Sequence, residues 1–261
     1  MVLNAEFVIV PDSDALAREA TQRFAGLARQ AVESRGRFSV ALSGGSTPGA
    51  LYQLLAEEPY RSQIPWEQVH LFWADERCVP PDDPGSNYRL ANETLIAHVP
   101  ILPANVHRVL GELAPEAAAR AYDLALRRFF SGPRPQFDLV LLGLGSDGHT
   151  ASLFPNSKAL EETERLAVAT IVFYKDRPAE RVTLTLPVLN SARQAMFLVS
   201  GSEKAEIVQA VLADVEERLP ARRIHPATGR LTWLLDAAAA VRVRVPDAPS
   251  YELLAAVSKR K

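Results

Sequence analysis

An acid and an imidazole lie close together in a glycine-rich stretch in the middle of the chain. The sequence FDLVLLGLGSDGHTASLFP, residues 137–155, begins as an apolar run typical of a buried strand and then places Asp147 and His149 among three glycines. Glycine lets the backbone approach a ligand closely, and loops at the carboxyl ends of parallel strands are the usual ligand sites of such sheets. His149 is therefore a candidate general base, with a hydrogen-bonded structural histidine as the alternative. Asp147 can orient the imidazole or close the turn through its own backbone.

Three further loops carry polar residues directly after predicted strands. The sequence SGGSTP, residues 43–48, has glycines, hydroxyls and helix-start N–H groups that suit a phosphate, but an ordinary turn capped by Ser46 or Thr47 fits equally well. Arg77 and Lys204 are cations in the other two loops, and each has the alternative of an acidic neighbour or a solvated position. The helix dipole disfavours a cation in a first helical turn, so Lys204 suggests an anionic ligand.

Other kinds of chemistry have weaker support in the sequence. The glycines of residues 143–148 match G-x-G-x-x-G, but Asp147 would place a carboxylate inside the phosphate loop and Pro155 would end a following helix early. These features argue against a dinucleotide site. No serine lies in a G-x-S-x-G motif, and neither the histidines nor the single cysteine, Cys78, show metal-ligand spacing. We therefore expect no metal and no cofactor.

The elements that would position these residues alternate between strands and helices. Apolar residues recurring every three or four positions from Leu16 to Ala31 predict an amphipathic helix. Strands are predicted at 38–42, 69–73, 139–142, 166–172, 181–186, 195–199 and 232–235, after a first strand near the start of the chain. Helices are predicted at 48–57, 88–98, 116–130 and 203–217. This alternation predicts an α/β fold with a largely parallel sheet and helices on both faces.

The order of the elements also predicts where the polar loops meet. The strands ending at Leu42, Trp73, Leu142 and Val199 each run into one of the polar loops, so all four loops would open on one edge of the sheet. The region 166–186 has two strands without an intervening helix, which predicts a local antiparallel pairing. The segment 219–230 is expected to be a loop without an assigned function. Since no compositional change marks a boundary, we expect a single domain over residues 1–261.

Composition limits the classes of partner. The 29 Lys and Arg against 31 Asp and Glu give a formal net charge of −2, which provides no general field for nucleic acid or acidic membranes. Any anionic ligand must therefore be held by a few local cations. One cysteine excludes a disulfide framework, and no apolar run approaches the roughly 18 residues of a membrane span. We expect a cytoplasmic protein and leave its oligomeric state open.

Five blocks of the sequence resemble those of 6-phosphogluconolactonases, in the same order: SGGSTP, ADERCVPPDDPGSNYR, GLGSDGHTASLFP, RVTLTLPVLN and VSGSEKA. The resemblance extends from about Phe7 to Asp236. It implies a Rossmann-like α/β fold, shared with glucosamine-6-phosphate deaminases. It also implies hydrolysis of a small phosphosugar lactone, 6-phosphoglucono-δ-lactone, to 6-phosphogluconate in the oxidative branch of the pentose phosphate pathway.

The resemblance implies roles for individual residues. His149 would take a proton from the water that attacks the lactone carbonyl, while backbone N–H groups of the glycine loops would stabilise the oxyanion. The residues that would hold substrate and phosphate are Gly44, Gly45, Ser46, Thr47, Arg77, Gly145 and Lys204. Further positions that match the family motifs are Asp75, Asn87 and Arg181.

Two other functions stay open on the sequence. The deaminase branch typically has an acidic residue before the proline of the histidine motif, where this chain has Phe154. A deaminase needs extra acid and base groups for its proton transfers, so the missing carboxylate favours the lactonase. The other alternative is a phosphosugar-binding module without activity, which would keep the cations and not use the base.

Overall fold

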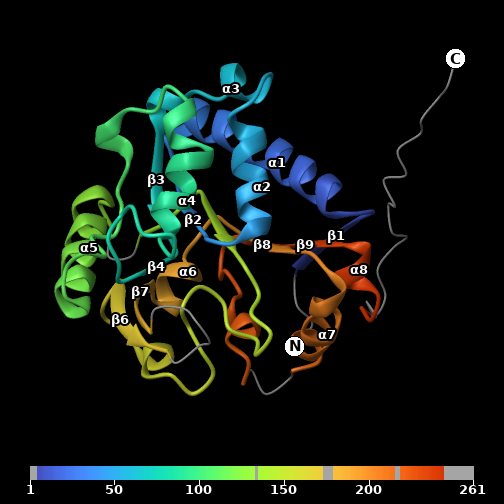
Figure 1. The fold of residues 1–261 in the computed structure, drawn as a ribbon. Coiled ribbons are helices and arrows are strands. Elements are labelled where there is room, and N and C mark those ends of the chain that lie inside the picture. Colours follow the sequence, from blue (N-terminus) through green and yellow to red (C-terminus); the bar gives the residue numbers. More distant parts are fainter. Residues whose placement is uncertain (1–4, 133–134, 173–178, 215–217, 244–261) are drawn as a thin grey trace, which may run out of the picture.

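A six-stranded parallel sheet forms the centre of the molecule (Figure 1). The structure is a computed structural model, and it describes residues 5–132, 135–172, 179–214 and 218–243. The strand order is β1-β9-β8-β5-β2-β3, and each neighbouring pair is parallel. The strands are β1 (Ala5–Val10), β2 (Phe38–Leu42), β3 (Val69–Trp73), β5 (Leu139–Leu142), β8 (Gln194–Val199) and β9 (Arg230–Asp236).

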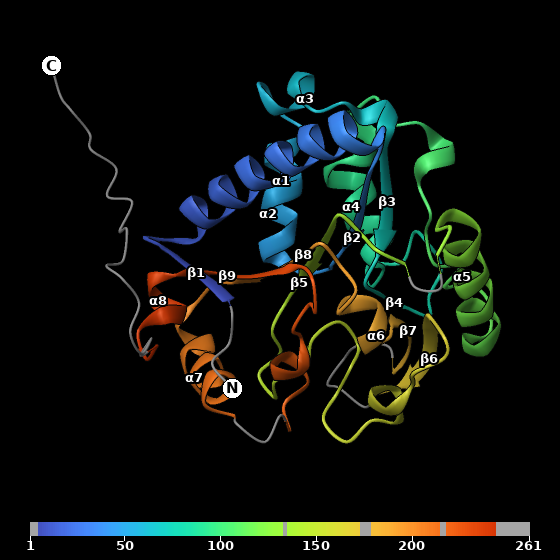
Figure 2. The same cartoon turned by 180° about the vertical axis from the view of Figure 1, so that it is seen from behind.

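Helices cover both faces of this sheet. In both views α1 (Ser13–Arg35) and α2 (Ser46–Leu55) lie on one side, and α7 (Ala205–Ala213) lies on the other (Figures 1 and 2). Because both faces are covered, the central strands are largely apolar, and every residue of β2 and β5 is buried. The predicted α/β fold is thus confirmed. The remaining helices are α3 (Tyr60–Gln63), α4 (Asn87–Thr94), α5 (Pro115–Phe129), α6 (Leu186–Leu189) and α8 (Ala237–Ala240).

The longest helix, α1, follows directly from local sequence signals. The Asp12 carboxylate accepts a hydrogen bond from the N–H of Ala15 at 2.8 Å, which satisfies one of the free donors of the first turn. Gly36 ends the helix in the left-handed region, with φ of 73°, and its N–H reaches the carbonyl of Val32. No helix in the described part of the chain is both long enough and apolar enough to cross a membrane.

A second, antiparallel sheet lies beside the first. It consists of β4 (Asp75–Arg77), β7 (Glu180–Leu184) and β6 (Ala167–Ile171), in the order β4-β7-β6. The antiparallel pairing of β6 with β7 was predicted. Strand β4 was not, because three residues with charged side chains carry no apolar pattern. This short strand is nevertheless what places Asp75 and Arg77.

Some predicted boundaries are wrong, each for a local reason. The strand expected to reach Leu186 ends at Leu184, since Leu186 begins α6 with a proline in its first turn. The helix expected over 88–98 ends at Thr94, and a 3₁₀ turn follows. The helix expected from 203 begins at Ala205 after another 3₁₀ turn, and its expected end at 215–217 lies outside the described residues. The short 3₁₀ stretches are Trp66–Gln68, Ile96–His98, Pro103–Asn105, Lys158–Glu161, Ser202–Lys204 and Pro220–Arg223.

A buried carboxylate ties β2 to the chain entering β5, at the amino ends of the strands. Asp138 is 6% exposed and accepts hydrogen bonds from the N–H and hydroxyl of Ser39, at 2.8 and 2.9 Å. Arg35 approaches the same carboxylate to 2.8 Å. Both carboxylate oxygens therefore have hydrogen-bond partners. They lie at the edge of the sheet opposite the polar loops.

Replacing this carboxylate tests its contribution to stability. Asp138→Asn leaves the Ser39 N–H facing an amide, so we expect the free energy of unfolding to fall by roughly 1–3 kcal/mol. Urea denaturation measures this, with Glu112→Gln, an acid of an exposed ion pair with Arg108, as the control of small effect. A loss no larger than that of the control would contradict the prediction.

Candidate active site

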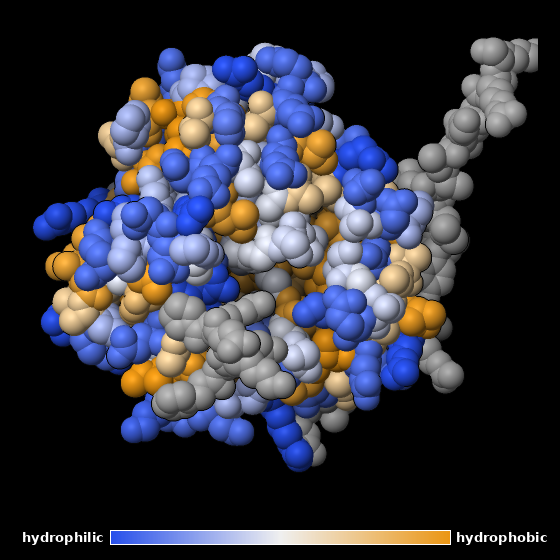
Figure 3. Space-filling model, in the orientation of Figure 1, coloured by the Kyte–Doolittle hydropathy of each residue, from blue (hydrophilic) through white to orange (hydrophobic). Residues whose placement is uncertain are grey.

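A cavity of about 350 Å³ opens at the edge of the sheet where β2, β5 and β8 end. Figure 3 shows its mouth as a hollow near the middle of the face, bordered by residues of intermediate hydropathy. Every candidate residue from the sequence lines the cavity except Asp147: Gly44, Gly45, Ser46, Thr47, Asp75, Arg77, Asn87, Gly145, His149, Arg181 and Lys204. The structure thus brings together side chains that are up to 160 positions apart, from Gly44 to Lys204.

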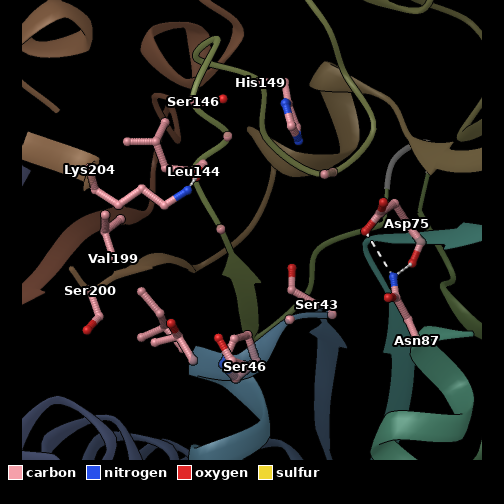
Figure 4. Close-up of a pocket in the computed structure, with 18 of the residues that line it drawn as sticks. Ser43, Ser46, Asp75, Asn87, Leu144, Ser146, His149, Val199, Ser200 and Lys204 are labelled. Carbon is pink, nitrogen blue, oxygen red and sulfur yellow. Dashed lines mark hydrogen bonds between the residues drawn. The ribbon is translucent and has the colours of Figure 1, made fainter. Parts of the chain in front are cut away.

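His149 is held on one edge and on one face of its ring. Its Nδ1 lies 2.5 Å from Oδ1 of Asp147, and the same oxygen accepts the backbone N–H of His149 at 3.1 Å. Asp147 therefore both orients the imidazole and closes the turn, which the sequence left as alternatives. Phe154 stacks on the imidazole, with ring centroids 4.0 Å apart. With Nδ1 on the carboxylate, Nε2 is the nitrogen that can accept a proton. Figure 4 shows the ring at the rim of the cavity.

Burial dominates the electrostatics of this imidazole. The pKa of His149 is lowered below its ordinary value, first because burial disfavours the charged form, while the Asp147 and Asp75 carboxylates offset part of that effect. A lowered pKa means that the imidazole is neutral over more of the physiological pH range. A neutral imidazole is the form that can act as a base.

Gly145 contributes through its missing side chain. A Cβ atom at this position would overlap the imidazole ring of His149, so only glycine lets the ring lie against the loop. The N–H of Gly145 donates to the carbonyl of His149 at 2.9 Å, and the N–H of Gly148 donates to the carbonyl of Gly145 at 3.0 Å. The loop itself therefore uses the N–H of Gly145, and Gly145 borders the cavity without a side chain of its own.

The segment 219–230, which had no assigned function, supports the histidine loop from behind. The N–H of Ala221 donates to the carbonyl of Gly148 at 3.0 Å. Gly148 has a φ of 81°, and a Cβ there would meet the side chain of Leu219. The segment is thus part of the scaffold that fixes the position of His149.

The SGGSTP loop leads into α2 without a side-chain cap. Gly45 is the residue before the helix, with φ of 109°, and no side chain accepts a hydrogen bond from the first turn. The proposed capping by Ser46 or Thr47 is therefore wrong. The first N–H groups of a helix have no acceptor within the helix, and they carry the positive end of its dipole. The start of α2 borders the cavity, so its free N–H groups and the positive end of its dipole suit an anion there.

The two cations reach the cavity from different loops. One terminal nitrogen of Arg77 (Nη1) donates to the carbonyl of Gly85 at 2.6 Å and to Oδ1 of Asn87 at 2.9 Å, rather than pairing with an acid beside it. The Lys204 ammonium donates to the carbonyl of Leu144 at 2.8 Å. In Figure 4 Lys204 approaches from the side opposite Asp75. No carboxylate neutralises either cation in the contacts described here, so both suit an anionic ligand.

A buried polar group closes the other side of the cavity. Asp75 accepts the hydroxyl of Ser152 at 2.6 Å and lies 3.7 Å from the guanidinium of Arg181, which is itself 4% exposed. Arg181 also lies 5.9 Å from the Phe154 ring centroid. Ser152 and Phe154 were not predicted as site residues. Their signal in the sequence was only their place in the same block as His149.

The structure also bears on cofactors. Between β5 and the 3₁₀ turn at Lys158–Glu161, the chain forms turns and no α-helix. The G-x-G-x-x-G stretch therefore lacks the helix that a dinucleotide site needs. Within the described ranges, no group of three or more His, Cys, Asp or Glu side chains is placed to hold a metal ion.

Comparisons with known proteins place the chain among phosphosugar enzymes. Residues 11–233 match the family model of glucosamine-6-phosphate isomerases/6-phosphogluconolactonase. A 6-phosphogluconolactonase from Synechocystis is 43% identical over 221 residues, covering 82% of this chain and 88% of the relative. The structure of a Trypanosoma cruzi 6-phosphogluconolactonase superposes with a TM-score of 0.84 at 29% identity, covering 94% and 99% of the two chains.

The other branch of the family shares the fold. A monomeric glucosamine-6-phosphate deaminase superposes with a TM-score of 0.75 at 21% identity, covering 91% of this chain and all of the deaminase, a likeness of fold alone. The family model, by contrast, matches most of the sequence. The chain therefore belongs to the family of glucosamine-6-phosphate isomerases and 6-phosphogluconolactonases.

Proposed function

We propose that this protein is a 6-phosphogluconolactonase, which hydrolyses 6-phosphoglucono-δ-lactone to 6-phosphogluconate. The observation that carries this proposal is the cavity in which the imidazole of His149, oriented by Asp147, faces the same space as Arg77 and Lys204. A base and two cations on separate loops suit a substrate with a reactive carbonyl at one end and a phosphate at the other. The curated lactonase relative at 43% identity supports the same activity.

The reaction needs one base and an electrostatic environment for negative charge. Nε2 of His149 takes a proton from water as the water oxygen bonds to the lactone carbonyl carbon, and the carbonyl electron pair moves onto oxygen. Backbone N–H groups of the glycine loops that border the cavity stabilise this oxyanion. When the oxyanion collapses, the bond between the carbonyl carbon and the ring oxygen breaks. The ring oxygen receives the proton from His149, which returns the base to its neutral form.

The remaining polar residues bind and orient the substrate. Arg77 and Lys204 hold the phosphate, while the hydroxyls of Ser46 and Thr47 hydrogen-bond to the sugar or its phosphate. Asp75, Asn87 and Arg181 form the opposite wall, and Gly44 and Gly45 let the ligand approach the backbone. Phe154 packs against the face of the imidazole, at the position where deaminases typically have a carboxylate. This arrangement favours the lactonase over the deaminase.

Two statements about the whole protein remain predictions. We infer that residues 1–261 form one domain, since a single hydrophobic cluster reaches from Val10 to Ala240 within the described residues. We also infer that the protein acts in the cytoplasm on a small phosphosugar. We infer that it binds no nucleic acid, because its formal net charge of −2 offers no general attraction for polyanions. Its oligomeric state stays open.

Removing the imidazole separates catalysis from binding. We expect His149→Ala to lower kcat for freshly generated 6-phosphogluconolactone by roughly 10²–10⁴-fold, the usual contribution of a positioned base. Affinity for 6-phosphogluconate, measured by calorimetry, should change less than about threefold, because the cations remain. The control is His98→Ala, which removes an exposed histidine bonded to the carbonyl of Glu93.

The same assay tests the alternative functions. Wild-type turnover retained by His149→Ala, after subtraction of spontaneous hydrolysis, would refute the role given to His149. Ammonia release from glucosamine 6-phosphate by the wild-type protein would establish the deaminase. Phosphosugar binding without any lactone turnover would establish the binding module.

The pH dependence follows from the lowered pKa of His149. We expect kcat/KM to rise with pH as His149 loses its proton, with a midpoint below the ordinary histidine value of 6.5. Asp147→Asn removes a carboxylate that raises this pKa, so the midpoint should move to still lower pH, and kcat should fall by about tenfold or more because the ring loses its orientation. Rates measured from pH 5 to 7 check both statements. In Asp123→Asn, which loses an ion pair with Arg127 and does not border the cavity, the midpoint should not move. A shift to higher pH in Asp147→Asn would contradict the electrostatic role of Asp147.

The glycine beside the histidine gives a steric test. We expect Gly145→Ala to displace the imidazole from Asp147 and to lower kcat by roughly tenfold or more, because the added methyl group overlaps the ring. Gly143→Ala is the matched variant, since a methyl group there meets no protein atom within 4 Å. NMR of the His149 ring should show a changed environment only in Gly145→Ala. An unchanged spectrum in that variant would contradict the prediction.

A further inference from the structure

One carboxylate near the cavity has no part in the mechanism described above. Glu76 follows Asp75 in β4, is 2% exposed and does not line the cavity. Its side chain nevertheless accepts four hydrogen bonds. Oε1 accepts the N–H groups of Arg77 and Asn87, at 2.7 and 2.8 Å. Oε2 accepts the N–H of Tyr88 at 2.7 Å and the hydroxyl of Ser86 at 3.1 Å.

Three of these donors belong to the amino end of α4. A carboxylate at this end of a helix receives free N–H groups and the positive end of the dipole, so Glu76 fixes where α4 begins relative to β4. The Ser86 hydroxyl, which donates to Glu76, also accepts the N–H of Arg89 at 3.1 Å and caps the helix. Burial raises the pKa of Glu76, and the N–H bonds from Asn87, Tyr88 and Arg77 act in the opposite direction.

The first residue of α4 is the one that reaches the cavity. Asn87 is 2% exposed, and its Nδ2 donates to the backbone carbonyl of Asp75 at 2.8 Å and to Oδ1 of the same residue at 3.3 Å. Its Oδ1 accepts the Arg77 guanidinium at 2.9 Å. Figure 4 shows the Asn87 amide facing Asp75. The amide also lies against Gly44, where a Cβ would overlap it. Asn87 therefore contacts residues from two of the loops that bind substrate.

We propose that Glu76 is a positioning residue for substrate binding, which holds the start of α4 so that Asn87 orients Arg77 and Asp75 toward the cavity. This inference rests on the proposed lactonase function. Glu76 itself touches no substrate. Substitution of Glu76 should change mainly KM for the lactone and Kd for 6-phosphogluconate. The reason is that Glu76 acts on Arg77, which is assigned to the phosphate, and not on His149.

Glu76→Gln is the informative substitution. An amide keeps one acceptor oxygen for the N–H groups of Arg77 and Asn87, but it turns an NH₂ group toward the N–H of Tyr88. We expect KM for the lactone and Kd for 6-phosphogluconate to rise together by roughly tenfold, with kcat changed by less than about threefold. Glu76→Asp keeps the charge on a shorter stem, so it should restore part of the lost affinity.

Asp138→Asn is the matched control. Asp138 is also a buried carboxylate that accepts a backbone N–H and a serine hydroxyl, but it lies at the amino ends of the strands, away from the cavity. Its loss should lower the melting temperature and leave KM and Kd unchanged. A merely structural role for Glu76 would give the same pattern in both variants. Unchanged KM and Kd in Glu76→Gln would therefore overturn the proposal.

A double-mutant cycle tests the route through Asn87. If Glu76 acts through Asn87, then Glu76→Gln combined with Asn87→Ala should raise Kd no further than Asn87→Ala alone. Independent, multiplicative effects would overturn the proposal, and this comparison holds even if Glu76→Gln is less stable, because Kd is measured on folded protein. A wild-type protein without lactone turnover would instead refute the proposed function. The change in Kd for 6-phosphogluconate between the wild-type protein and Glu76→Gln would still report whether Glu76 positions the site.

Discussion

The hydrogen bond between Asp147 and Nδ1 of His149 is the contact on which the proposed chemistry depends. It decides which nitrogen of the ring is left to accept a proton, and it holds the ring at the rim of the cavity. Burial of the imidazole, on which the ring of Phe154 stacks, favours its neutral form. The rest of the site can be understood as the structure needed to keep this pair in place and to bring an anionic substrate to it.

That structure is assembled from loops that are distant in the sequence, and the parallel sheet is what makes their meeting possible. Strands β2, β5 and β8 run in the same direction, so the chain that leaves each of them arrives at the same edge. The antiparallel sheet adds the opposite wall, because β4 and β7 carry Asp75 and Arg181 next to each other. Buried carboxylates lie at both ends of this arrangement, with Asp138 below the strands and Glu76 beside the cavity. Both accept backbone N–H groups and a serine hydroxyl, but Asp138 joins β2 to the chain entering β5, whereas Glu76 holds the start of α4.

The sequence was sufficient for the parts of the molecule that follow a repeating pattern or a glycine signal. The apolar runs gave the bounds of β2, β3 and β5, and the four polar loops pointed to one edge of the sheet. The sequence was insufficient where tertiary contacts determine the local structure. Strand β4 has no apolar pattern, and the absence of a side-chain cap on α2 depends on how Ser46 and Thr47 are turned. The use of the Gly145 N–H within its own loop and the four donors gathered by Glu76 are likewise visible only in the folded chain.

The contact between Leu219 and Gly148 links the histidine loop to a segment some seventy positions downstream. Because Gly148 adopts a backbone conformation that other residues rarely adopt, the two positions are constrained as a pair. Exchange of the histidine loop between related enzymes should therefore succeed only when the residue at 219 travels with it. A substitution at position 219 should therefore reach the active site through the histidine loop, although no residue of the segment 219–230 borders the cavity.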